Sequence, residues 1–96
     1  MTAPDAALAE LRSRIDTLNG IIVFALAERF RQTRQVGELK AAHGLPAHDP
    51  DREAREFARL EELAQDAGLD PAIVGDVFGL IVDRVKENHR KISGEQ

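Results

Sequence analysis

The stretch LAELRSRIDTLNGIIVFALAERF, residues 8–30, decides the fold of this chain. Its apolar residues recur at alternating steps of three and four, the period of one helix face; they are Leu8, Leu11, Ile15, Leu18, Ile22 and Ala25. No proline interrupts the helical pattern from Asp5 to about Ala42. At 1.5 Å per residue such a helix would extend roughly 55 Å, more than the diameter of a compact chain of this length. We therefore expect a second copy of the chain to cover it.

Two Asp-Pro pairs predict the starts of two further helices. Asp49–Pro50 and Asp70–Pro71 suit helix starts, because Asp can cap the free amides and Pro fits the first helical position. Gly68 suits the end of the first of these helices, and the tail at residues 93–96 is expected to fray. No alternating strand pattern is present. The sequence thus predicts an all-α fold of three helices, one very long, in a single domain over residues 1–96.

Composition excludes several classes of function. The chain has no cysteine, so disulfides, thiolate catalysis and thiolate metal sites are excluded. A net charge of −4 argues against a nucleic-acid partner. No long apolar run or basic leader is present, so we expect a cytoplasmic protein without membrane contact. His43 and His48 lack a helical i, i+4 spacing, and we expect neither a metal nor another cofactor.

Charged residues interrupt the apolar face of the long helix. Arg29 takes the next position of the pattern after Ala25, and Lys40 lies on the same face, about 16 Å further along the axis. Their long side chains can converge on one small anion, which would satisfy charges that are costly to bury unpaired. Arg12 is roughly 25 Å from Arg29 and could reach that ligand only from the partner of a symmetric dimer. Alternatively, Arg12 and Arg29 extend into solvent or pair with nearby acids.

Two further residues share apolar faces of the shorter helices. Glu53 precedes Phe57 by four residues, on the face that its helix would bury; a Glu in the first turn also suits the helix dipole. His89 follows Val85 by four residues. It is either a ligand group or a histidine whose hydrogen bonds are satisfied in the core or at the helix end.

Four motifs together carry a resemblance to a known family: LRSRID (residues 11–16), LAERF (26–30), VGELK (36–40) and DPDRE (49–53). In this order and spacing the chain resembles the all-helical chorismate mutases, over about residues 7–92. The resemblance implies an intertwined helical homodimer with two identical active sites, each built from both chains. It also implies a small dianionic substrate and no cofactor.

The resemblance also implies roles for individual residues. Arg12 from the partner and Arg29 would bind the two carboxylates of chorismate. Lys40 would bind a carboxylate and the ether oxygen of the breaking bond, and Glu53 would hold the ring hydroxyl. Two arginines suit this task, because a guanidinium binds carboxylates bidentately and stays charged.

Asp49 and Arg52 would shape the hydroxyl side of the pocket, and the departures from the family pattern fall in the third helix. Val85 and His89 stand where well-known bacterial members have Ser and Gln, and Val85 cannot donate a hydrogen bond. We hypothesise that His89 replaces the Gln as a donor to the ether oxygen and makes activity depend on pH.

The implied reaction converts chorismate to prephenate in Phe and Tyr biosynthesis. This intramolecular Claisen rearrangement needs no proton or nucleophile from the protein; binding the reactive conformer and stabilising charge on the ether oxygen would suffice. Two alternatives remain open. The same scaffold could act on 4-amino-4-deoxychorismate or isochorismate, although Glu53 argues against the latter. The chain could also be a non-catalytic dimerisation or regulatory module.

Overall fold

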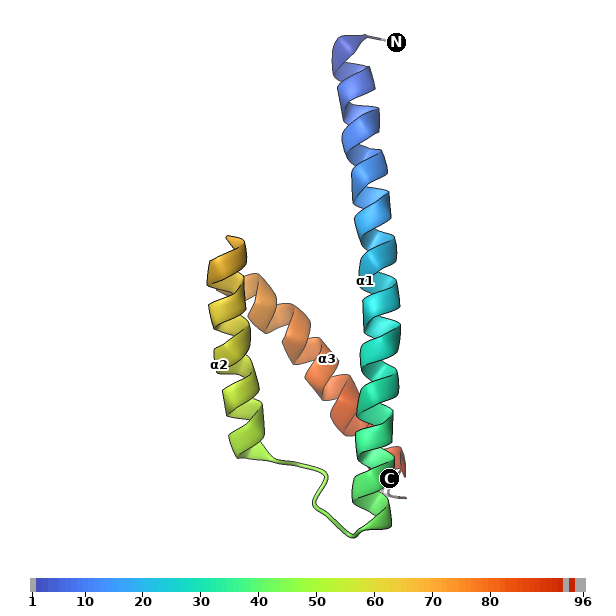
Figure 1. Cartoon of the computed structure of the whole chain (residues 1–96), viewed down its shortest axis with the longest axis vertical. Coiled ribbons are helices and arrows are strands. Elements are labelled where there is room, and N and C mark those ends of the chain that lie inside the picture. The colour runs from blue at the N-terminus through green and yellow to red at the C-terminus, as the bar shows by residue number, and fades with distance from the viewer. Residues whose placement is uncertain (1, 93, 95–96) are drawn as a thin grey trace. The chain divides into compact units, whose positions relative to one another are not determined.

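Three helices make up the secondary structure of the computed structural model, which describes residues 2–92 and Gly94. They are α1 (Ala3–Ala42), α2 (Pro50–Ala67) and α3 (Pro71–Ile92), and the described residues contain no strand (Figure 1). The prediction of an all-α fold with one very long helix is confirmed. The tail that was expected to fray lies outside the described residues, apart from Gly94.

The first turn of α1 begins at Ala3, two residues before Asp5, where the predicted helical stretch begins. The Thr2 hydroxyl accepts a hydrogen bond from the Asp5 amide at 3.2 Å, and the Asp5 carboxylate accepts bonds from the Thr2 hydroxyl and amide at 2.6 and 3.3 Å. This reciprocal pairing satisfies amides that a helix start otherwise leaves open, as in a capping box. The bonds from the Thr2 side chain and backbone lower the pKa of Asp5, because they favour its ionised form.

The caps of α2 are those that the sequence predicted. Asp49 has an extended backbone, and its side chain accepts a hydrogen bond from the Arg52 amide at 3.1 Å. At the other end Gly68 has a φ of 70°, a conformation that glycine adopts without strain. The Leu69 amide then reaches back to the Ala64 carbonyl at 2.8 Å, which closes the helix end.

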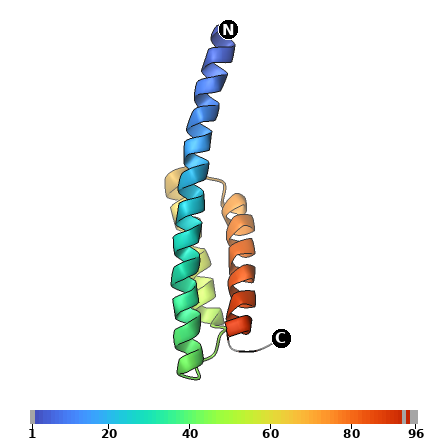
Figure 2. The ribbon, with the colours of Figure 1, turned by 90° about the vertical axis from the view of Figure 1, so that its right-hand side faces the viewer.

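The chain divides into two compact units, one up to Gln32 and the other from Thr33 onward. In the second unit α2 and α3 pack on each other, joined by a short turn (Figure 2). The buried apolar residues are Ala64 of α2 and Val74 and Ile81 of α3. This small core holds together the two helices that carry Glu53 and His89.

In the first unit the apolar face of α1 is open. The large apolar residues of this face are between 44% and 56% exposed; they are Leu8, Leu11, Ile15, Leu18 and Ile22. A contiguous apolar surface of this kind usually marks an interaction site. The second copy that would cover it stays a prediction. Within the described part of the chain, no helix has both the length and the apolar character of a membrane span.

A glycine allows the last turns of α1 and α3 to approach closely. Gly37 is buried, and a Cβ atom at this position would lie 2.7 Å from Cδ2 of His89 and 3.1 Å from Cδ1 of Ile92. The imidazole Nε2 of His89 donates a hydrogen bond to the Thr33 carbonyl, one helical turn before Gly37, at 2.9 Å. The imidazole therefore has little room to move away from an added methyl group.

Replacing Gly37 with Ala should consequently destabilise the protein by about 1–3 kcal/mol, as overpacking of a tight contact does. Chemical denaturation at a fixed protein concentration measures the change. Gly75→Ala in α3 is the matched control, because a Cβ atom at that position would have no neighbour within 4 Å. That control should gain up to about 1 kcal/mol from helix propensity. Equal effects of the two substitutions would contradict the close contact.

Candidate functional site

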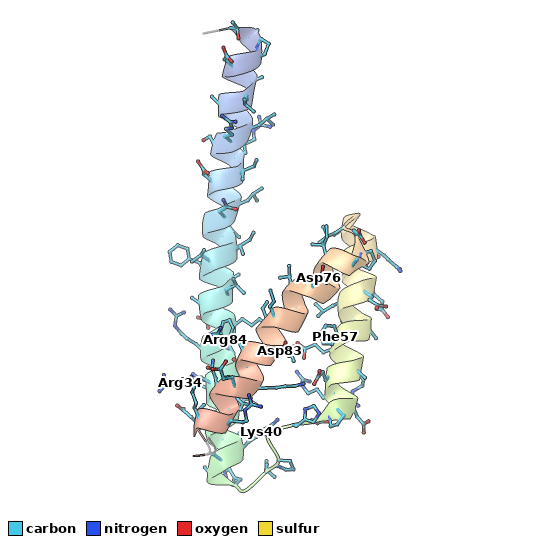
Figure 3. All side chains as sticks on the ribbon, turned by 180° about the vertical axis from the view of Figure 1, so that it is seen from behind. Arg34, Lys40, Phe57, Asp76, Asp83 and Arg84 are labelled. Carbon is cyan, nitrogen blue, oxygen red and sulfur yellow. The ribbon has the colours of Figure 1, made fainter. Side chains whose placement is uncertain are left out.

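A recess of about 140 Å³ brings Lys40 and His89 together. Lys40 belongs to α1, close to its C-terminal end and beside the loop (Figure 3), whereas His89 belongs to α3. The other residues that line the recess come from α1 and the following loop; they are Gly37, Ala41, Leu45, Pro46 and Ala47. Lys40 is half-buried, and its Nζ donates a hydrogen bond to the Ala47 carbonyl at 3.4 Å. The recess therefore presents a cation to any ligand that enters it.

His89 is buried and has a structural role at this place. A carbonyl oxygen can only accept, so the bond between Nε2 and the Thr33 carbonyl requires a proton on Nε2. In the neutral ring Nδ1 is then an acceptor, and only the imidazolium can donate from Nδ1. The alternative of a core histidine with satisfied hydrogen bonds thus accounts for Nε2. The role of a ligand donor stays a prediction and would have to use Nδ1.

Glu53 pairs with residues that the sequence analysis did not select. Its carboxylate lies 3.2 Å from Nζ of Lys86 in α3 and 3.7 Å from Nδ1 of His48 in the loop. Lys86 is 33 positions away in the chain, and no local pattern could have predicted the contact. His48 had been considered only as a metal ligand. Both were missed because the loop and the packing of α3 on α2 decide the contact.

A larger recess of about 470 Å³ lies beside this ion pair. Its lining residues are Pro46, Ala47, His48, Lys86 and Arg90. Pro46 and Ala47 also line the recess of Lys40 and His89. The two recesses therefore adjoin at the same loop, with Lys40 of α1 and Lys86 and Arg90 of α3 around it.

The structure assigns Asp49 and Arg52 to the start of α2. The Asp49 side chain is the cap, and the exposed Arg52 lines a separate shallow recess of about 300 Å³ on α2, together with Arg55 and Arg59. Arg52 thus lines neither of the two recesses at the loop. Val85 is half-buried in α3, one turn before His89. Binding roles for these three residues stay predictions.

Arg12 and Arg29 belong to the first unit. Arg12 is exposed, whereas Arg29 is half-buried and its Nη1 atom is buried. The convergence of Arg12, Arg29 and Lys40 on one ligand stays a prediction.

Comparison of the sequence with known proteins shows the family to which the chain belongs. A family model described as chorismate mutase type II matches residues 11–90, which is most of the chain. The chain belongs to this family. Residues 11–90 include all four motifs of the resemblance and the positions of all eight predicted site residues.

Several curated relatives agree with this assignment. The chain is 32% identical over 79 residues to a chorismate mutase of Methanocaldococcus jannaschii, covering 82% of this chain and 80% of that protein. It is 36% identical over 73 residues to a T-protein of Enterobacter agglomerans, covering 76% of this chain. It is also 32% identical over 84 residues to a 4-amino-4-deoxychorismate mutase of Streptomyces pristinaespiralis, covering 84% of this chain and 65% of that protein. The chain spans only 20% of the length of the T-protein.

Proposed function

We propose that this chain is a chorismate mutase, which converts chorismate to prephenate in aromatic amino acid biosynthesis. The observation that carries the proposal is the recess at the loop, where a half-buried lysine and a buried histidine from two helices line one small cavity. A chain of this family with a cationic recess suits a small dianion. The M. jannaschii relative, named a chorismate mutase, supports the same substrate.

The proposed mechanism uses electrostatics and positioning only. Arg12 of the partner and Arg29 bind the two carboxylates of the substrate. They thereby hold the side chain of the substrate over its ring, in the reactive conformer. Lys40 donates to the ether oxygen, where negative charge develops as the carbon–oxygen bond breaks. The electrons move within the substrate, so no side chain has to give or take a proton. The reaction as proposed needs no cofactor.

The remaining residues act on the ring side of the substrate. Glu53 accepts a hydrogen bond from the ring hydroxyl, and Asp49 and Arg52 support that side by fixing the start of α2. Val85, by contrast, gives an apolar contact where a hydrogen bond to a substrate carboxylate would otherwise form. In this proposal residues 1–96 act as one chorismate mutase domain in the cytoplasm, as an intertwined homodimer.

A second candidate is the 4-amino analogue of chorismate. Its support is the S. pristinaespiralis relative, named a 4-amino-4-deoxychorismate mutase, at 32% identity. The reaction would be the same rearrangement, with an ammonium in place of the ring hydroxyl. Purified protein given each substrate in turn, with product formation followed by chromatography, distinguishes the two.

Lys40→Met should lower kcat/KM for chorismate on the order of 100- to 1,000-fold, because it removes the donor to the developing charge. The measurement is the loss of chorismate absorbance together with prephenate formation. Lys91→Met is the matched control, since Lys91 is exposed and pairs with Glu87 at 3.4 Å on its own helix. An unchanged rate in the Lys40 variant would rule out its role.

The role of His89 leads to a prediction of pH dependence. With Nε2 bonded to the Thr33 carbonyl, only the doubly protonated ring can donate from Nδ1, so a donor role for His89 should make turnover depend on pH. His89→Gln keeps an amide donor at every pH and should give a flatter pH–rate profile. His43→Gln, in the exposed loop, is the control and should keep the profile. The same profile in all three proteins would refute a donor role for His89.

The shared site has its own test. Arg12→Ala and Arg29→Ala chains should each be inactive as homodimers, but a heterodimer holds one site with both arginines. Random pairing after joint refolding should therefore restore roughly one quarter of the wild-type sites. The open apolar face of α1 supports such a dimer. If Arg12 acted on the site of its own chain, mixing would restore nothing.

A further inference from the structure

The ion pair between Glu53 and Lys86 connects α2 to α3 at the edge of the larger recess. Nζ of Lys86 lies 3.2 Å from one carboxylate oxygen of Glu53 and 3.3 Å from the other. The exposed fractions are 38% for the Lys86 side chain and 30% for that of Glu53, so both are partly shielded from water. Charges in such a setting interact more strongly than those of a fully exposed pair.

Other cations of α3 are used differently. Arg84 and Lys91 both pair with Glu87, at 3.5 and 3.4 Å, along the surface of their own helix. Lys86 instead reaches across to another helix, and it lines the recess of about 470 Å³. A ligand in this recess would therefore meet Lys86 directly, whereas Glu53, which does not line the recess, lies behind it as the ion-pair partner of Lys86.

We propose that Lys86 determines specificity, by making Glu53 a site for an uncharged hydroxyl and disfavouring an ammonium. The inference rests on the proposed function, in which Glu53 holds the ring hydroxyl of chorismate. A carboxylate has about four acceptor positions, and one lysine leaves some of them open to a hydroxyl. A neutral hydroxyl can bind to Glu53 through one of these open acceptor positions alone.

An ammonium would meet a different balance of charge. The Glu53 carboxylate already has Lys86 as a counter-charge, so repulsion between the two cations cancels part of the attraction that a second cation gains. For two like charges about 6 Å apart near a protein surface, this repulsion corresponds to a 10- to 100-fold loss in relative affinity. His48 and Arg90 line the same recess and add to its basic character. Lys86 thus shifts the preference away from the 4-amino analogue and toward chorismate.

The test compares two substrates in one set of variants. The measured quantity is kcat/KM for chorismate divided by kcat/KM for 4-amino-4-deoxychorismate. In the wild type this ratio should exceed one. In Lys86→Met it should fall at least about tenfold, chiefly through a lower KM for the amino substrate, because the competing charge is gone. Lys86→Arg keeps the charge and should keep the ratio.

Two further variants make the result decisive. Lys91→Met removes an equal charge from the same helix without touching Glu53, and its ratio should equal that of the wild type. Lys86→Gln keeps a donor to Glu53 but loses the charge, and it should lower the ratio even if the Met variant does not fold. Thermal unfolding of each variant shows which of them are folded.

The possible failures are separable. A ratio that does not change in folded Lys86→Gln and Lys86→Met overturns the specificity role, while turnover of chorismate by the wild type leaves the proposed function intact. A wild-type preference for the amino substrate overturns the inference as well. If the wild type accelerates neither substrate, the proposed function itself fails.

Discussion

The close approach of α1 and α3 at Gly37 is the contact on which the candidate site depends. A bare Cα on α1 lets the His89 imidazole lie against the helix and bond to the Thr33 carbonyl. That contact brings the last turns of α3 next to the loop that follows α1, where Lys40 and His89 share a recess. A side chain at Gly37 would push α3 away from both. The smallest residue therefore sets the distance between two polar ones.

Charge is arranged in the second unit so that each of the two lysines at the recesses has a defined neighbour. Lys40 bonds to a loop carbonyl, and Lys86 bonds to a carboxylate of α2. The carbonyl that binds Lys40 is a weak, neutral partner, whereas the carboxylate that binds Lys86 is a full counter-charge. This difference suits two tasks within one binding region: Lys40 can turn to an anionic group, whereas Lys86 keeps Glu53 compensated. The family assignment and the geometry agree on an anionic substrate.

Short-range sequence signals explain which parts of the fold and of the candidate site could be predicted from the sequence. The Asp49 and Gly68 caps and the unbroken α1 follow from short-range rules, so the three helices were predicted nearly to the residue. The start of α1 was missed by two residues, because the Thr2 capping bonds lie outside the apolar pattern. The pairing of Glu53 with Lys86 depends on how α3 packs on α2, which no periodicity specifies. The hydrogen bond from Nε2 of His89 to the Thr33 carbonyl could not be predicted either, because it depends on how α3 packs on α1.

The bond from Lys40 to the Ala47 carbonyl has a mechanical consequence. A ligand that takes the ammonium competes only with one neutral acceptor at 3.4 Å, so the exchange has a small energetic cost. When it happens, the loop loses this bond at Ala47, while the Leu45 amide keeps its bond to the Lys40 carbonyl at 2.8 Å. Pro46 and Ala47 line both recesses, so the ammonium that a ligand would take also holds the wall that the two recesses share.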